Sequence, residues 1–218
     1  MLKDAGMLGS KPAKTPIPTW LQLHGDETPL LTDAPREAHL KAALHVLKYL
    51  KEPPSQGLFY SRNTVLSLQC YSDADWGTCP ETRRSLTGYC VYLGNSLVSW
   101  KTKKQTMVSG SSEEAEYRNM VAMTCEIQWI QYLLKDLLLD VLPIDLWCDS
   151  KDAIHITSNP VFHEHTKHLD IDCHIVRNQY LNGMIKPQHI STTSQIAELF
   201  TKALPKPAFA KLVSKLGM

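Results

Sequence analysis

The stretch YSDADW, residues 71–76, decides the fold because a predicted strand ends there on two acids, Asp73 and Asp75. Residues 66–72, rich in leucine and aromatic side chains, have the composition of a strand. Two further strands are expected within residues 85–108, and Gly94-Asn95 between them suits a tight hairpin turn. The opening pattern is therefore a strand that ends on acids, followed by an antiparallel hairpin. A solvated turn is the simpler interpretation of the two acids.

A long helix follows the hairpin and carries the next acid. The segment GSSEEAE, residues 110–116, starts this helix, with Ser111 and Glu114 at the spacing of a capping box. From Glu116, steps of three and four residues reach an apolar stripe made of Met120, Met123, Ile127, Ile130 and Leu134. Glu116 should therefore lie on the packed face, whereas Glu114 shares a face with Arg118. A carboxylate on a buried face is costly without a partner, and a metal ion is one such partner.

The remaining elements predict an α/β fold with a mixed sheet. Residues 1–33 should be extended or poorly ordered, because they show little periodicity. The expected elements are a helix at 34–51 that Pro35 starts, a strand at 57–60, a strand at 143–149 that ends on Asp149, helices at 150–157 and 167–181, a strand at 185–190, and a helix at 194–204 that Pro205 closes. Three antiparallel strands, then strands separated by helices, predict a five-stranded mixed sheet flanked by helices.

Composition sets the broad class of the protein. The chain has 218 residues, which suits one core of ordinary size plus an appendage, and its net charge is +1, so any basic surface must be local. The six cysteines form no CxxC pair. Four lie in apolar runs and are expected to be buried free thiols: Cys70, Cys90, Cys125 and Cys148. With no apolar signal core or membrane span, we expect an intracellular protein, cytoplasmic or nuclear.

Acids that meet at one sheet edge suit the hydrolysis of a phosphodiester. Two Mg²⁺ ions roughly 4 Å apart can activate a water and stabilise the leaving oxygen, and such hard ions take carboxylate ligands. Without metal, mutual repulsion would raise the pKa values of the acids. Asp149 also has a simpler interpretation, because Asp is a favoured N-cap for the helix expected at 150–157.

Six motifs, taken in chain order, resemble one family. They read SDADW, TRRSLTGYCVYLGNSLVSWKTKKQT, SSEEAEYR, LWCDSKDAI, HTKHLDIDCHIVR and QIAELFTKAL. Together they resemble the ribonuclease H domain that ends the polyprotein of copia-type LTR retrotransposons, over about residues 60–207. Upstream, KPAKTPIP and APREAHLKAALHVLKYLKEPPSQGLFYS are similar to the end of the same element's reverse transcriptase and its connection.

The resemblance implies a ribonuclease H-like fold and a set of metal ligands. In that family the first and fourth strands are neighbours, which would bring Asp73 and Asp149 together under Glu116. These three are the implied catalytic ligands of two Mg²⁺ ions, with Mn²⁺ as a substitute. The family's fourth ligand is the Asp of a motif like Gln-x-Ala-Asp-x-x-Thr-Lys. Here that motif reads QIAELFTK, residues 195–202, and Glu198 stands in its place; Asp170 is the second candidate.

The implied activity is endonucleolytic hydrolysis of the RNA strand of RNA–DNA hybrids, leaving 3′-hydroxyl and 5′-phosphate ends. The implied partners are the hybrid and other Pol or Gag proteins of the element, without a membrane. An inactive relic that at most binds nucleic acid is the alternative. An integrase on the same fold is disfavoured, because such enzymes usually place the last acid on a late helix and lack the early helix acid.

The resemblance also divides the chain. Residues 1–59 would be a remnant of the reverse transcriptase tail and connection, 60–207 the nuclease, and 208–218 a C-terminal tail. The family's segment between LLTD and APREAH is deleted here, and no Tyr-x-Asp-Asp motif occurs, so we expect no polymerase activity.

Basic and aromatic residues suggest where a nucleic acid could bind. A local patch that could contact phosphates consists of Arg83, Arg84, Lys101, Lys103 and Lys104; a solvated strand edge guarded by lysines is the alternative. We expect Trp76 and Trp100 in the core of the sheet. A zinc site could be drawn from His163, His165, His168, Cys173 and His174, but these lie partly along one predicted helix, which is unlike a tetrahedral structural site.

Overall fold

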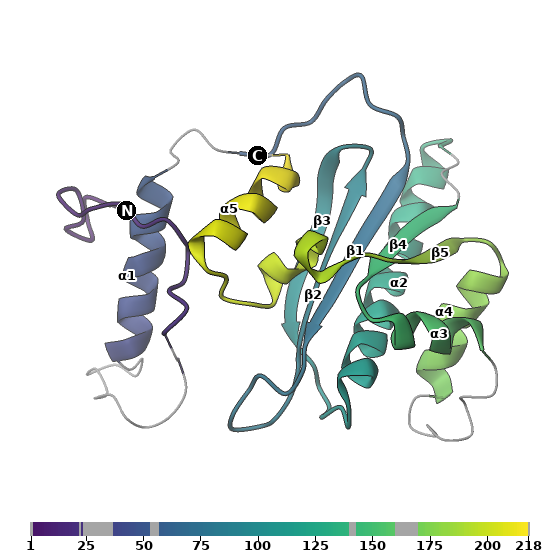
Figure 1. Cartoon of the computed structure of the whole chain (residues 1–218). Helices are drawn as coiled ribbons and strands as arrows, with labels where there is room; N and C mark the ends of the chain where they lie inside the picture. Colours follow the sequence, from purple (N-terminus) through teal and green to yellow (C-terminus); the bar gives the residue numbers. More distant parts are fainter. Residues whose placement is uncertain are drawn as a thin grey trace.

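A computed structural model describes residues 2–21, 23, 37–52, 57–139, 143–159 and 170–217 of the chain. The elements in chain order are α1 (Glu37–Lys51), β1 (Leu68–Asp75), β2 (Leu86–Leu93), β3 (Ser96–Lys104), α2 (Ser112–Asp136), β4 (Ile144–Cys148), α3 (Lys151–Ser158), α4 (Asp170–Leu181), β5 (Ile185–His189), the 3₁₀ helices η3 (Thr192–Ser194) and η4 (Ile196–Phe200), α5 (Lys206–Val213), and η5 (Ser214–Leu216). Figure 1 shows their arrangement.

The five strands form one mixed sheet in the order β3-β2-β1-β4-β5. β1, β2 and β3 are antiparallel, whereas β4 is parallel to both β1 and β5. The tight turn between β2 and β3 falls at Gly94, whose φ of 60° is the left-handed conformation that favours glycine. The α/β class, the hairpin, and the adjacency of the first and fourth strands that the ribonuclease H resemblance implies are all confirmed.

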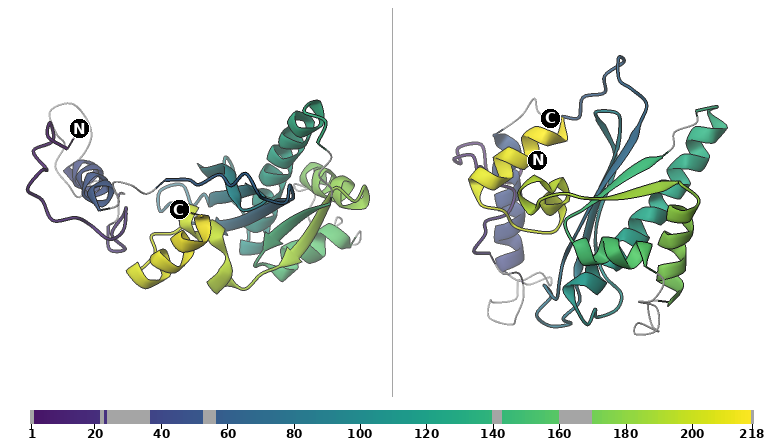
Figure 2. Two further views of the ribbon diagram at one scale, coloured as in Figure 1. Left: turned by 90° about the horizontal axis from the view of Figure 1, so that it is seen from above. Right: turned by 45° about the vertical axis from the view of Figure 1, so that its right-hand side comes forward.

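Helices cover both faces of the sheet, and each face has its own apolar cluster. α2, α3 and α4 lie on one face, whereas η4 and α5 lie on the other (Figures 1 and 2). The larger cluster joins the predicted stripe of α2 to Leu68, Leu146 and Val176. The smaller cluster packs Ile196 and Leu216 against Cys90 and Tyr92 of β2. Burial on both faces explains why β2 is buried along nearly its whole length.

α2 forms as the sequence predicts. The Ser111 hydroxyl caps its N-terminus by accepting a bond from the Glu114 backbone N–H at 3.2 Å. Glu114 in turn accepts two bonds from the Arg118 guanidinium, at 2.9 and 3.1 Å. All five residues of the predicted stripe are buried, and so is Glu116. The 3.6-residue period therefore identified the packed face correctly.

The C-terminal elements differ from the prediction. In place of one helix over 194–204 there are two short 3₁₀ helices, with Gln195 in an extended conformation between them. The side-chain amide of Gln195 donates to the carbonyl of Ser72 at 2.8 Å. This bond fixes Gln195 against the sheet and interrupts the helix that was predicted there. The expected tail contains α5 and η5, in which Leu212 and Leu216 are buried. The domain limits at 59/60 and 207/208 stay a prediction.

α1 lies beyond α5 as seen from the sheet (Figures 1 and 2), whereas Thr15, Pro16 and Ile17 line a pocket together with Leu86 of β2 and Thr102 of β3. α1 has no buried residue, and the ring of Tyr49 packs edge-on against Phe209 of α5 with 5.8 Å between the ring centroids. Residues 57–60 are not a strand, which corrects the prediction made for them. Within the described residues, no helix is both long and apolar enough to cross a bilayer.

Three predicted burials are wrong. Trp76 and Trp100 are 49% and 52% exposed instead of filling the core. Trp76 donates its indole N–H to the carbonyl of Ser109 at 3.0 Å, so its polar edge holds it at the surface. Cys125 is exposed because it falls on the outer face of α2, whereas Cys70, Cys90 and Cys148 are buried free thiols as predicted. Pro35, His163, His165, His168 and the side chain of Cys173 lie outside the described residues.

Candidate metal-binding active site

Two of the predicted acids meet because β1 and β4 are parallel neighbours. The last pair in their register joins Ser72 to Cys148, so Asp73 and Asp149 follow at the same edge of the sheet. The Asp149 carboxylate accepts a hydrogen bond from the Thr192 hydroxyl at 2.9 Å. It does not cap α3, because Ser150 takes that role by accepting from the Ala153 N–H. The simpler interpretation of Asp149 as an N-cap is therefore wrong.

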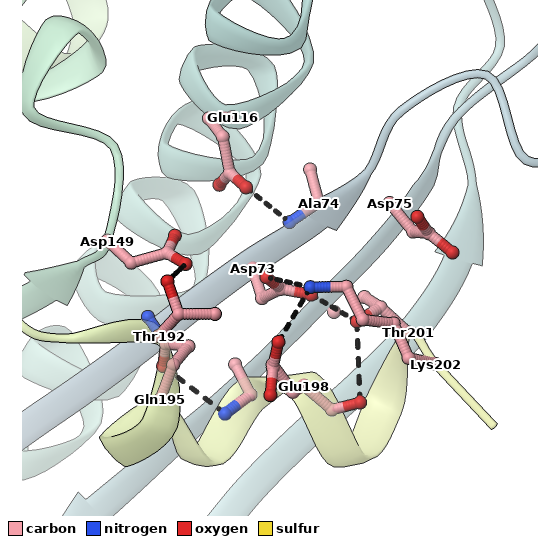
Figure 3. Close-up of polar contacts among 12 residues, drawn as sticks. Asp73, Ala74, Asp75, Glu116, Asp149, Thr192, Gln195, Glu198, Thr201 and Lys202 are labelled. Carbon is pink, nitrogen blue, oxygen red and sulfur yellow. Dashed lines mark hydrogen bonds and ion pairs between the residues drawn. The ribbon is translucent and has the colours of Figure 1, made fainter. Parts of the chain in front are cut away.

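Glu116 reaches this edge from the first turns of α2. One of its carboxylate oxygens accepts from the backbone N–H of Ala74 at 2.9 Å (Figure 3). The residue is only 7% exposed. Burial, and then the negative charges of Asp73 and Asp149, raise the pKa of Glu116 from its ordinary value to about 9, although the Ala74 bond opposes this. A buried carboxylate of this kind is stable as a charged group only beside a cation.

Asp73 lies between the Glu116 and Asp149 pair and Glu198, and its carboxylate points to the C-terminal elements (Figure 3). It accepts from the Thr201 hydroxyl and, at 3.1 Å, from the Lys202 ammonium. Burial raises the pKa of Asp73 from its ordinary value, and the contacts with Lys202 and Thr201 only partly offset that effect. Asp75, two residues on, lies apart from the other acids in the same view.

Glu198 joins the site from η4. Its carboxylate binds the Lys202 ammonium at 2.8 Å, so one ammonium links Glu198 to Asp73. Burial lowers the pKa of Lys202, but the two carboxylates raise it by more, and the net pKa is above the ordinary value of lysine. The predicted fourth acid is thus placed beside the first. The side chain of the second candidate, Asp170, is outside the described part of the chain.

Neutral groups hold the backbone around the acids. The buried amide of Asn119 donates to the carbonyls of Asp73 and Gly88, at 2.7 and 2.9 Å. Gly88 is paired with Asp73 across β1 and β2, and a Cβ there would lie 2.6 Å from the Thr201 side chain. Only glycine therefore lets η4 approach closely enough for Thr201 and Lys202 to reach Asp73.

Cys148 is a neighbour of the site that sequence reasoning missed. Ligand atoms of Glu116, Cys148 and Asp149 all lie within 4.8 Å of one another. The thiol donates to the second Glu116 oxygen at 3.9 Å, and burial raises its pKa well above the ordinary value. The motif LWCDS places this cysteine directly before Asp149, which is the sequence pattern that could have identified it. A protonated thiol is a poor ligand for Mg²⁺.

The predicted basic patch is divided between two places. Lys101, Lys103 and Lys104 are exposed on β3, where they line a groove with Gln105 and Arg118. Arg83 and Arg84 are in the loop before β2, and the Arg83 guanidinium lies close to Gly77. Arg83 has a φ of 54°, an unusual conformation for a residue with a side chain. None of the five is among the residues that contact the acids.

Comparisons with known proteins agree with the resemblance. The chain is 42% identical over 185 residues to the retrovirus-related Pol polyprotein from transposon RE1 of Arabidopsis thaliana. It is 40% identical over 185 residues to the Pol polyprotein from transposon RE2 of the same plant. Each match covers 84% of this chain but only 13% of the relative. No model of a known protein family matches the chain.

Among solved structures, the N-terminal RNase H domain of rv2228c from Mycobacterium tuberculosis is similar with a TM-score of 0.47 and 12% identity. The match covers 69% of this chain and 98% of that one. The sequence matches define the class: three homologues that match over 84% of this chain are retrovirus-related Pol polyproteins. More particularly, the chain is homologous to part of the Pol polyproteins of copia-type transposons.

Proposed function

We propose that this chain is a metal-dependent endonuclease of the ribonuclease H type, which hydrolyses the RNA strand of RNA–DNA hybrids. One observation carries the proposal: four carboxylates from separate elements converge at one edge of the sheet (Figure 3). They are Asp73, Glu116, Asp149 and Glu198. The mutual repulsion of four carboxylates with few cations near them lowers the stability of the fold. Such an arrangement therefore favours a functional role for these acids over a structural one.

The donor set fits a hard divalent cation. The four acids offer only carboxylate oxygens, the ligands that Mg²⁺ prefers, and Mn²⁺ accepts the same set. Two features of the chain support this fit: the raised pKa of the buried Glu116, and the Lys202 ammonium between Asp73 and Glu198, which takes the kind of position a metal cation would take. When bound, the ions would activate the attacking water and stabilise the leaving oxygen.

The chain itself supplies orientation. The Ala74 N–H fixes one oxygen of Glu116, and the Thr192 hydroxyl fixes one oxygen of Asp149. The other oxygen of Glu116 is in contact with the Cys148 thiol, but both carboxylates keep acceptor positions for a ligand, because an ionised carboxylate has about four of them. The Asn119 amide holds the backbone of β1 and β2 beneath them. Positioned ligands reduce the reorganisation that the reaction would otherwise require.

The lysines of β3 are our candidate contacts for the hybrid. Lys101, Lys103 and Lys104 are exposed along one strand, and Arg118 from α2 lies across the groove that they line. Cations in a row can follow phosphates without reading the base sequence. We propose Arg83 and Arg84 as secondary contacts, because they precede β2 in a separate loop.

We propose the same division of the chain as the sequence suggested. Residues 60–207 would be the nuclease, 1–59 a remnant of the reverse transcriptase connection, and 208–218 the C-terminal segment. The partners would be an RNA–DNA hybrid and other Pol or Gag proteins of the element, in the cytoplasm or the nucleus. The homology with part of a Pol polyprotein supports the proposed partners. The division of the chain and its location are proposals from the sequence.

The test is a cleavage assay on a labelled hybrid. With Mg²⁺, the purified chain should degrade the RNA strand and leave 3′-hydroxyl and 5′-phosphate ends, without cutting single-stranded RNA or duplex DNA. Asp73→Asn and Asp149→Asn should each abolish cleavage while the protein stays folded by circular dichroism. Salt-dependent binding of the hybrid without cleavage in Mg²⁺ or Mn²⁺ would contradict the proposal and favour an inactive binding module.

A further inference from the structure

Lys202 lies within the group of acids. Its ammonium is 3.1 Å from an oxygen of Asp73 and 2.8 Å from an oxygen of Glu198 (Figure 3). The Asp73 side chain is 1% exposed, whereas that of Lys202 is 31% exposed, so the ammonium reaches a buried carboxylate from a partly open side. Two of the four acids therefore already share a cation that belongs to the chain.

The other two acids form a separate set. Glu116 and Asp149 have ligand atoms within 4.8 Å of one another and of the Cys148 sulfur, and this group includes neither Asp73 nor Glu198. The site is thus divided into a Glu116–Asp149 side and an Asp73–Glu198 side. Lys202 contacts carboxylates on the second side only.

We propose that Lys202 is a tethered competitor of one divalent cation: its ammonium holds the Asp73–Glu198 side, so that the chain binds one ion readily and a second only when Lys202 moves away. This inference rests on the proposed metal site, and it names what regulates the filling of that site. It makes Lys202 a positioning residue for the acids and a determinant of metal stoichiometry.

Charge and tethering both support competition. A lysine ammonium is a compact positive charge with three hydrogen-bond donors. A divalent cation bound to the same two carboxylates would be repelled by this ammonium, so the two cations compete for the site. Lys202 follows Glu198 by four residues and lies two positions beyond the end of η4, so the chain keeps the ammonium at a high effective concentration beside the acids. The flexible four-carbon side chain and its partial exposure give the ammonium a path to solvent when a metal displaces it.

The experiment counts bound Mn²⁺ by the loss of the electron paramagnetic resonance signal of the free ion. Wild-type chain should bind one Mn²⁺ tightly and a second one weakly. Lys202→Gln should bind the second ion at least about tenfold more tightly, because the repelling charge is gone. Lys206→Gln is the matched control, since it removes the same charge from an exposed position four residues further on, and it should behave like wild type.

A second measurement uses unmodified protein, in case Lys202→Gln fails to fold. Acetylation of lysines, followed by mass spectrometry, should be slow at Lys202 in metal-free protein and severalfold faster with Mg²⁺. Lys206 of the same molecules is the internal standard and should not respond. Equal labelling of Lys202 with and without Mg²⁺, or identical Mn²⁺ binding by Lys202→Gln and wild type, would overturn the proposal.

The outcomes for the two proposals can be told apart. Metal counting and lysine labelling need no substrate, so Lys202 can compete with a metal even in a chain that cuts nothing. In that case the cleavage assay would reject the nuclease while the competition stands. Conversely, full cleavage by wild type with unchanged metal binding in Lys202→Gln would support the nuclease and reject the competition.

Discussion

Replacing Glu116 with Gln should make the metal-free protein more stable at neutral and alkaline pH. In the folded chain the pKa of Glu116 is raised to about 9 from an ordinary value of 4.5, chiefly by burial. Above the ordinary value the unfolded chain releases this proton while the folded chain keeps it. The contribution of this proton to the unfolding free energy is therefore fully present below pH 4.5 and is lost as the pH rises toward 9.

The size of the effect follows from the pKa difference. Each pKa unit corresponds to about 1.4 kcal/mol, so wild-type protein should lose up to about 3 kcal/mol by pH 7 and about 6 kcal/mol by pH 9 from this group alone. Gln keeps a carbonyl acceptor for the Ala74 N–H but has no proton to release. The variant should lack this part of the pH dependence.

Urea unfolding at pH 5, 7 and 9 in the presence of EDTA measures the effect. The gain in unfolding free energy for Glu116→Gln over wild type should be below about 1 kcal/mol at pH 5 and should grow to about 3 kcal/mol at pH 7. Glu126→Gln is the control on the same helix, where the carboxylate accepts from Ser99 and Tyr89. It should lower stability by a similar amount at all three pH values. If the unfolding free energy of Glu116→Gln fell with pH as steeply as that of wild type, the reasoning would be refuted.

Three further predictions concern the rest of the site. Mn²⁺ should support faster hybrid cleavage than Mg²⁺, because the extra methylene of Glu198 strains the octahedral geometry of Mg²⁺. Glu198→Asp should bring the initial rates in the two metals closer together, and an unchanged ratio of these rates would exclude Glu198 as a ligand. Gln195→Ala should cost about 3 kcal/mol in urea unfolding, because it leaves buried carbonyls without a donor; a change below about 1 kcal/mol would contradict that role. Replacing Lys101, Lys103 and Lys104 with Gln should weaken hybrid binding and reduce the slope of log K against log salt by about 3; an unchanged slope would place the hybrid elsewhere.

Local patterns predicted much of the fold. The period of α2, its capping box and the Gly94 turn depend on residues a few positions apart, and all three appear as expected. The predicted helix over 194–204 failed for the opposite reason. Its middle is set by contacts of Gln195 with β1 and β4, which lie 123 and 48 positions away along the chain. Helix propensity does not include such contacts, and tertiary hydrogen bonds override it.

The acids of the site were easier to predict than the cation among them. Asp73 lies near the end of a strand and Glu116 falls on a packed helical face, so each has an unusual position that the sequence shows by itself. Lys202 has none, because a lysine near the end of a short helix is usually solvated. Its contact with Asp73 spans 129 positions and depends on Gly88 to admit η4. Only the three-dimensional arrangement could place it there.

The combination of buried acids and buried amides explains how this edge stays folded without metal. Asp73 and Glu116 gain no stability from being close, because burial and mutual repulsion raise the pKa of both. Asn119 and Gln195 stabilise the same strand ends through backbone carbonyls, and a neutral amide does this at any pH. The amides that hold the strand ends are therefore separate from the acids of the site. For this reason, neutral substitutions of the acids should abolish the chemistry without making the metal-free protein less stable, whereas substitutions of the amides should lower stability.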